Sequence, residues 1–233
     1  MPVDLSKLDN PAWHALTERH AGFAQGTNEL KRYDPAIVLF AGFNRGVKNI
    51  TEQFDKVFAT GDSFFLFDDY PTLPSGYEVE TVVQCMQMVC EKPMRVSITE
   101  NIIPLDASNH ADMYSLVSEV FPGYYLPGTA AMGDYFGIFK EGKLVAMAGE
   151  RLCMDGLTEI SAVVTHPDHA GRKYAQQLVT HLDEKNLQAG IIPFLHTGHK
   201  NERAINIYEL LGYTKRRIIP VTKIKRNNFN RLP

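Results

Sequence analysis

The residues best suited to chemistry lie in the last third of the chain. Small or β-branched apolar residues at 161–164 predict a strand buried on both faces, and Pro167 ends it because proline cannot donate to a ladder. A polar turn through Gly171 leads into a helix that begins near Arg172 or Lys173. The unpaired N–H groups at such a helix start bind phosphate readily, so this order of strand, turn and helix predicts a phosphate-binding site.

Arg172 and Lys173 place two cations in the first turn, where the helix dipole favours anions. A polyanionic ligand in the turn would explain them, and two solvated side chains are the alternative. A second helix follows. Asn201 is a good N-cap, Tyr208 belongs to its apolar stripe, and Gly212 ends it.

These two blocks together resemble the GCN5-related N-acetyltransferases (GNAT superfamily), and most closely their FR47-like branch. In that family the turn follows the pattern Gln or Arg, two residues, Gly, one residue, then Gly or Ala, and cradles the acetyl-CoA pyrophosphate. Here Ala170 and Lys173 depart from the usual Gln or Arg and the central Gly, whereas Gly171, Arg172 and Ala175 fit the FR47-like variant. The resemblance covers roughly residues 96–222.

The resemblance implies a site for acetyl-CoA, whose pantetheine arm enters a wedge between two splayed strands and meets unpaired backbone groups of the first. The residues that it assigns to cofactor binding are Val163, Val164, Thr165, Ala170, Gly171, Arg172, Lys173, Tyr174, Ala175, Asn201 and Ala204.

Transfer to an amine needs a proton acceptor for the amine and a proton donor for the departing thiolate. The matched tyrosine, Tyr208, is the expected donor, and a purely packing tyrosine is the alternative. Glu159 or His196, each near a strand end, could accept a proton through water, although an isolated Glu or His at a strand end more often has a structural role. Cys153 has no basic neighbour in sequence to activate it as a nucleophile, which favours direct transfer.

The expected activity is acetyl transfer from acetyl-CoA to a primary amine of a small molecule or peptide. The alternative, based on Ala170 and Lys173, is a non-catalytic acyl-CoA-binding or interaction protein that keeps the fold. A metal site is not expected, because His166, His169, His196 and His199 lack carboxylate or cysteine partners at ligand spacing. A homodimer is left open.

The net charge, the lengths of the apolar runs and the cysteine count limit which partners and which cellular locations are expected. The formal net charge of −3 gives no support for nucleic-acid binding, and no run approaches the roughly 20 apolar residues of a membrane span. The N-terminus lacks a signal-like pattern, so a cytoplasmic protein is expected. The odd number of cysteines, Cys85, Cys90 and Cys153, argues against a disulfide framework and favours buried free thiols.

We predict a mixed α/β (α+β) protein with the GNAT fold, in which helices flank a mixed central sheet with splayed strands. The domains are expected at 1–94 and 95–233, with the boundary near Pro93. The first reads as helical over residues 1–60 and then as strands, which fits a smaller, degenerate GNAT-like copy. The second is expected to open with a strand at 95–98 and a helix at 108–120 capped by Ser108 or Asn109.

Overall fold

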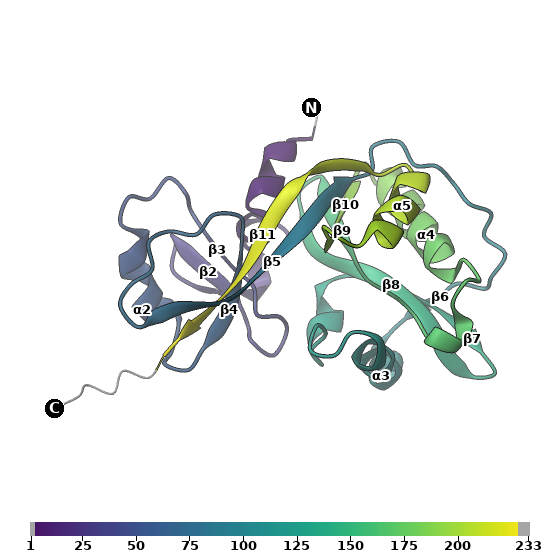
Figure 1. Ribbon diagram of the computed structural model, residues 1–233, viewed down its shortest axis with the longest axis horizontal. Helices are drawn as coiled ribbons and strands as arrows, with labels where there is room; N and C mark the ends of the chain where they lie inside the picture. The colour runs from purple at the N-terminus through teal and green to yellow at the C-terminus, as the bar shows by residue number, and fades with distance from the viewer. Residues whose placement is uncertain (1–2, 228–233) are drawn as a thin grey trace.

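A computed structural model describes residues 3–227 and shows a mixed α/β protein built on one eight-stranded sheet (Figure 1). The strand order is β4-β11-β5-β10-β9-β8-β7-β6, and every neighbouring pair is antiparallel except β9 with β10. The predicted fold class is therefore confirmed. The strands are β4 (Ser63–Phe67), β5 (Tyr77–Val89), β6 (Ile103–Leu105), β7 (Tyr135–Lys140), β8 (Lys143–Met154), β9 (Leu157–Thr165), β10 (Ile192–Gly198) and β11 (Thr214–Arg226).

β7 and β8 form a hairpin, and the geometry of its turn explains the Glu141-Gly142 sequence. Glu141 and Gly142 occupy the two central positions with φ of 51° and 77°. Two-residue hairpin loops of this kind require positive φ at both positions, which glycine adopts without strain. β8 then runs as an almost wholly buried strand through the middle of the sheet, and it positions the strand that follows.

Three longer helices cover the two faces of this sheet. α4 (Tyr174–Gln188) and α5 (Glu202–Leu210) lie on one face, where Leu178 and Leu182 pack against Ala146 and Ile160. α3 (His110–Val120) covers the opposite face near β8 and β9. The apolar spacing of the α4 and α5 sequences therefore marks the sides that face the sheet.

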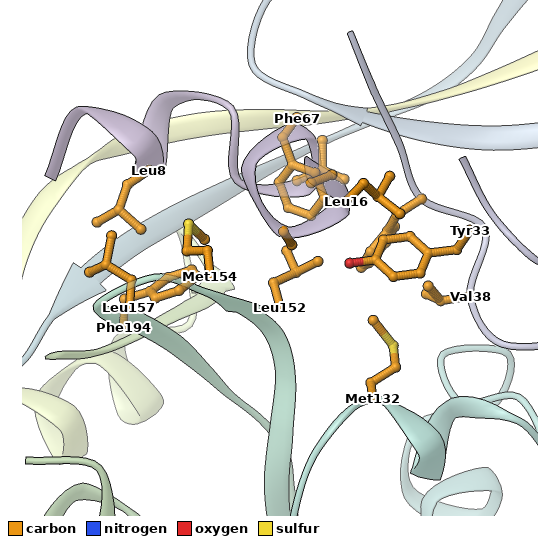
Figure 2. Packing of buried hydrophobic residues seen from close by; sticks show 14 of the residues in the cluster. Leu8, Leu16, Tyr33, Val38, Phe67, Met132, Leu152, Met154, Leu157 and Phe194 are labelled. Carbon is orange, nitrogen blue, oxygen red and sulfur yellow. The ribbon is translucent and has the colours of Figure 1, made fainter. Parts of the chain in front are cut away.

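The N-terminal part packs onto the same face as α3 but nearer the start of β9. α1 (Pro11–Thr17) brings Leu16 against Leu152, and Leu8 from the preceding 3-10 helix lies near Leu157 (Figure 2). A small sheet of β1 (Ala24–Gly26), β2 (Leu30–Tyr33) and β3 (Ala41–Phe43) and the helix α2 (Phe54–Val57) complete this part. One hydrophobic core thus joins N-terminal residues to β8, β9 and β10.

The prediction that residues 1–60 are helical is wrong over much of that length. The helical spacing from Trp13 continues past Thr17 in the sequence, but α1 ends there and three short strands follow. β2 and β3 are largely or fully buried against α1, and β1 packs against α2, so tertiary packing overrides the local pattern.

Of two further expectations near residue 100, the strand is wrong and the helix cap is confirmed in part. Residues 95–98 form no strand, because this mostly exposed segment passes outside the sheet, and Gln177 of α4 accepts hydrogen bonds from the Thr99 and Glu100 amides just after it. Asn109, one of the two predicted caps, is the N-cap residue of α3, but its side chain makes no capping bond to that helix. It instead bonds the Asp106 amide, in a reciprocal capping box around the 3-10 turn Ala107–Asn109.

The division at residue 94 stays a prediction, but the large sheet extends across it. β4 and β5 precede residue 94, and β5 lies between β10 and β11 (Figure 1). The C-terminal basic stretch forms β11, and its Lys223 and Arg226 pair with Glu80 and Asp55.

Candidate functional site

The two parallel strands of the sheet separate partway along their length. β9 and β10 pair only from Ile192 with Leu157 to Phe194 with Glu159. Beyond that point β9 continues to Thr165 on its β8 side, and β10 continues to Gly198 on its β5 side. The facing edges of these segments are therefore unpaired, as the predicted splay requires, and an extended ligand bearing amide groups can bond to them.

A bulge in β9 lies beside this gap. Between the pairs Met147–Val164 and Gly149–Ser161, β9 contains one residue more than β8. Ala162 lies in this bulge with φ of 49°, an uncommon conformation for a residue with a Cβ. Bulges redirect backbone groups and occur often next to active sites, so the bulge marks the part of β9 most suited to contact a ligand.

The predicted phosphate turn directly follows β9. A 3-10 turn, Pro167–His169, leads to the exposed residues Gly171 and Lys173, and α4 begins at Tyr174. In the described part of the chain, no backbone or side-chain group accepts from the N–H groups of residues 171–173. The turn thus presents free donors at the N-terminus of a long helix, an arrangement suited to a pyrophosphate.

The backbone conformation at Lys173 is one that glycine adopts without strain, which fits the glycine usual at this position in the GNAT proteins that the sequence resembles. It is the N-cap of α4 and has φ of 60°, a left-handed conformation that costs a residue with a Cβ about 1–2 kcal/mol. Gly171 has φ of 79° in the same turn. Lysine therefore keeps the geometry of the turn at some cost in stability, while adding an exposed cation beside the free donors.

The second block of the resemblance forms α5. Asn201 is its N-cap, as predicted, and accepts a hydrogen bond from the Ala204 amide at 3.1 Å. Tyr208 is half-buried on the side that faces α4, and its ring centroid lies 5.7 Å from that of Tyr213. Burial, and then the nearby Asp183 carboxyl, raise the pKa of Tyr208 to about 12, so its phenol stays protonated at neutral pH.

Glu159 and His196, the two predicted candidates for the base, are joined in one buried unit. His196 Nδ1 lies 2.8 Å from Glu159 Oε1, and Arg151 donates two hydrogen bonds to the same carboxylate at 2.8 and 2.7 Å. Burial alone would raise the pKa of Glu159. The charge and hydrogen bonds of Arg151, with a further contribution from His196, outweigh burial and lower that pKa to about 2.

The other nitrogen of His196 faces Gln87 on β5. Gln87 Nε2 donates to Leu8 O at 2.8 Å and lies 2.9 Å from His196 Nε2, while Gln87 Oε1 accepts from Arg216 at 2.8 Å. Since the amide nitrogen is a donor, His196 Nε2 accepts and Nδ1 carries the proton toward Glu159. One polar side chain from each of β8, β9, β10, β5 and β11 thus forms a continuous network.

The predicted proton donor and the predicted bases lie on opposite faces of the sheet. Tyr208 packs against the core under α4 and α5, whereas Phe67 packs beside His196 on the face covered by the N-terminal part. Within residues 3–227 no hydrogen bond or ring contact joins Tyr208 to Glu159 or His196. The gap between β9 and β10 is the element that separates these two groups.

Arg151 and Gln87 were not singled out by the sequence analysis. A signal for Arg151 was present, because the turn at Asp155-Gly156 folds β8 back on β9 and brings residue 151 close to residue 159. Gln87 carried no such signal. Its neighbours in the sheet come from β10 and β11, which are more than 100 residues away in the sequence.

The remaining site expectations concern thiols, metals and membranes. All three cysteines are free; Cys90 and Cys153 are buried, Cys85 is partly buried, and burial raises the pKa of Cys153 to about 12. The described residues hold no cluster of three or more side chains of the kind that ligate metals. Among the same residues, no helix has the length and apolar character to span a bilayer.

Comparison with known proteins independently supports the resemblance to GNAT proteins. The family model of FR47-like proteins matches residues 135–219. A GNAT-family protein from Novosphingobium aromaticivorans, described as a candidate acetyltransferase, is 28% identical with a TM-score of 0.84, covering 95% of this chain and 99% of its own. A GCN5-related N-acetyltransferase from Kribbella flavida has the same fold, with 15% identity, a TM-score of 0.61 and coverage of 94% and 97%. No curated protein sequence matches this chain.

These findings support the GNAT superfamily for this chain, with residues 135–219 matching the model of its FR47-like branch. The fold and the family support acyl transfer from acetyl-CoA in general. The gap, the bulge and the turn all lie within the matched residues 135–219, so the match covers the part of the chain that forms the candidate site.

Proposed function

We propose that the protein is an N-acetyltransferase that uses acetyl-CoA and transfers the acetyl group directly to a primary amine. The observation that supports this most strongly is the separation of β9 from β10 beside the free N–H groups at the start of α4. When bound, acetyl-CoA supplies an acetyl group activated as a thioester. The chain's own contribution is to hold that ligand, admit an amine and manage two protons.

The groups that would hold the cofactor follow from the geometry. The edge of β9 from Val163 through Val164 to Thr165 would hold the pantetheine arm, with Val163 and Thr165 directing their backbone groups into the gap, and the amides of Gly171 and Lys173 would face the pyrophosphate. Three side chains of the turn and four further residues complete the proposed set: Ala170, Arg172, Lys173, Tyr174, Ala175, Asn201 and Ala204.

Two protons must move during the transfer. The amine loses one as the C–N bond forms, and the sulfur gains one as the C–S bond breaks. Tyr208 is the proposed donor, because burial keeps its phenol protonated. For the amine proton, Glu159 and His196 remain the two proposed acceptors. Glu159 stays ionised beside Arg151, and its contact with His196 Nδ1 holds the imidazole in place.

The Tyr208→Phe variant tests this assignment. Removing one hydroxyl should lower kcat by about 100-fold if the phenol donates a proton, because general acid catalysis contributes about that much. Acetyl-CoA affinity, measured by calorimetry, should stay within about twofold. Tyr213→Phe is the matched control, since it removes a neighbouring buried hydroxyl outside the proposed chemistry. Equal turnover by Tyr208→Phe and the wild type would remove Tyr208 from the mechanism.

A second candidate is a non-catalytic acyl-CoA-binding or interaction protein. It is favoured by one specific observation, the strained Lys173 at a position where the family uses glycine. Calorimetry with CoA separates the two in part, because absence of binding favours an interaction protein. The Lys173→Gly variant should then bind CoA if lysine alone prevents it.

A further inference from the structure

Arg151 lies at the accessible end of the network that it forms with Glu159 and His196. Its side chain is 18% exposed, whereas those of Glu159 and His196 are 1% and 4% exposed. Two of its nitrogens, Nε and Nη2, bond the Glu159 carboxylate at 2.8 and 2.7 Å. Within residues 3–227 no acceptor bonds Nη1, so the edge of the guanidinium formed by Nη1 and Nη2 keeps free donors.

An aromatic ring from the N-terminal part holds this guanidinium in place. Its central carbon lies 4.9 Å from the centroid of the Phe40 ring, within the range of a cation–π contact. The Phe40 ring packs edge-on against Phe67, with 5.0 Å between the centroids, and Phe67 lies beside His196. Because Glu159 bonds one edge of the guanidinium and Phe40 covers one face, the free edge is fixed before any ligand arrives.

The guanidinium lies near the point where β9 and β10 separate. Glu159 is the last residue of β9 that pairs with β10, and Arg151 bonds to its side chain. Burial would lower the pKa of Arg151, but Glu159 outweighs burial, and Tyr135 and Cys85 add to the rise. Both of these groups lie beyond the last pair, since Cys85 is opposite Gly198 of β10 and Tyr135 is level with the bulge of β9. The charge of Arg151 therefore acts in the open part of the gap, where the amine has to meet the thioester.

The free edge of Arg151 fits a carboxylate. Nη1 and Nη2 present parallel N–H groups, and this fork matches the two oxygens of one carboxylate. The guanidinium repels an ammonium group, and a neutral carbonyl oxygen forms a weaker hydrogen bond than a charged acceptor does. Partial burial strengthens the preference, because a partly desolvated charge interacts more strongly than one in water. The chemistry of this edge thus favours an acceptor that carries a carboxylate besides its amine.

The amine of such an acceptor has to lie close to its carboxylate. Each residue of β9 beyond Glu159 advances by about 3.3 Å, so the first residues along the gap lie roughly 3–7 Å from Glu159. An α-amine is bonded to the carbon next to its carboxylate and falls within this range, whereas the side-chain amine of lysine extends several bonds farther. An α-amino acid also enters as a zwitterion, which adds no net charge to the pair of Arg151 and Glu159.

We propose that the acceptor is a free α-amino acid, whose carboxylate binds the free edge of Arg151 while its amine faces the gap between β9 and β10. The proposal rests on the proposed acetyl transfer and specifies its acceptor. The C–N bond forms at the α-amine, the C–S bond of the thioester breaks, and the products are an N-acetyl amino acid and CoA. Arg151 takes no part in these bonds. It determines specificity, with Glu159 on one edge and the substrate on the other.

The test compares common L-amino acids, taken singly, with their amides as acceptors for the full chain and acetyl-CoA. Each pair shares its side chain and α-amine, and only the amino acid carries a carboxylate. Because the amide lowers the basicity of the amine, kcat/KM is expressed per concentration of unprotonated amine. We expect the preferred amino acid to exceed its amide by roughly 10- to 100-fold, the effect of a hydrogen-bonded charge pair.

Arg151→Lys keeps a cation beside Glu159 but lacks the fork that bonds a carboxylate at two points. It should lower the ratio of amino-acid to amide kcat/KM by about tenfold, mainly through the KM of the amino acid. Arg216→Lys is the matched control, because Arg216 bonds Gln87 in the same network but does not contact Glu159, and it should keep that ratio. Competition by propionate, compared with propionamide, leaves the protein unchanged. Propionate should inhibit at least tenfold better, which tests the proposal even if Arg151→Lys folds poorly.

Three results would overturn the proposal. Amides acetylated as well as amino acids, or a polyamine acetylated in preference to both, would remove the carboxylate site while leaving the proposed acetyl transfer intact. An equal loss for amino acid and amide in Arg151→Lys would make Arg151 a purely structural residue. Failure of amino acids, amides and a polyamine alike to consume acetyl-CoA would overturn both this proposal and the proposed function.

Discussion

Two buried carboxylates on opposite faces of the sheet have opposite electrostatic environments. Glu159 is 0% exposed and Asp183 is 1% exposed. Glu159 accepts two hydrogen bonds from Arg151 and contacts His196, and its pKa is lowered to about 2. Asp183 of α4 accepts a single hydrogen bond, 2.6 Å from the Tyr213 hydroxyl, and burial raises its pKa to about 7.

The difference shows that burial alone does not decide the charge of a carboxyl group. Desolvation favours the neutral acid at both positions, but only Glu159 has a cation within hydrogen-bond distance. The charged group lies where β9 and β10 separate, and the group near neutrality lies close to Tyr208 and Tyr213. The face with the ion pair is thus fixed in charge, and the face with the proposed proton donor can respond to pH near 7.

Removing the cation should have the largest effect. Arg151→Met would leave Glu159 buried without its guanidinium, and we expect the free energy of unfolding at pH 7 to fall by about 3–5 kcal/mol. Urea unfolding measures this change. The double variant Arg151→Met with Glu159→Gln removes both charges and should recover much of the loss. Equal stability of the Arg151→Met variant and the wild type would mean that the ion pair does not offset the desolvation cost of burying the Glu159 carboxylate.

Asp183→Asn should change the pH dependence of stability by a smaller amount. The pKa of Asp183 is raised from 3.8 to about 7, so the folded protein binds more protons than the unfolded chain between those pH values. The stability from this group is present below about pH 4 and is lost as pH rises through about 7, and the part lost between pH 5 and pH 8 is roughly 2–3 kcal/mol. The variant should unfold with a flatter dependence across this range, as followed by thermal unfolding at pH 5 and pH 8.

Glu159 should show the reverse dependence, which provides an internal control. Its pKa is lowered from 4.5 to about 2, so its contribution is present above about pH 4.5 and is lost as pH falls toward 2. A loss of stability above pH 6 that persists in Asp183→Asn would contradict the assignment to Asp183.

His196→Leu should have the smallest effect of the three. The imidazole bridges Glu159 and Gln87, but Arg151 continues to compensate the Glu159 charge in this variant. We expect the free energy of unfolding to fall by about 1–2 kcal/mol, the cost of leaving the Gln87 amide without one partner. Urea unfolding compares it with Arg151→Met. A loss as large as in Arg151→Met would place His196, and not Arg151, at the centre of the network.

Features that depend only on neighbouring residues could be predicted from the sequence. The turn at residues 167–173 and the N-cap at Asn201 are local features, so neighbouring residues were enough to place them. The splay between β9 and β10 was expected from the family resemblance and is present. The alternation along residues 77–89 is likewise a local pattern, and these residues form the strand β5.

What could not be predicted depends on distant partners. The helical spacing after Trp13 gave no sign of the strands β1 to β3, whose packing against α1 and α2 decides their structure. Nor could residue types show that β5 inserts between β10 and β11, which brings Gln87 to His196. Pairing between strands far apart in the sequence is set by the whole fold.

The proposed activity requires acetyl-CoA to bind in the gap between β9 and β10. A crystal structure with a stable acetyl-CoA analogue tests this most directly. We expect the pantetheine arm to bond with the backbone of Val163 and Thr165, the pyrophosphate to meet the amides after Gly171, and the Tyr208 hydroxyl to lie within hydrogen-bond distance of the sulfur. An analogue bound elsewhere, or β9 and β10 fully paired in the complex, would contradict the account.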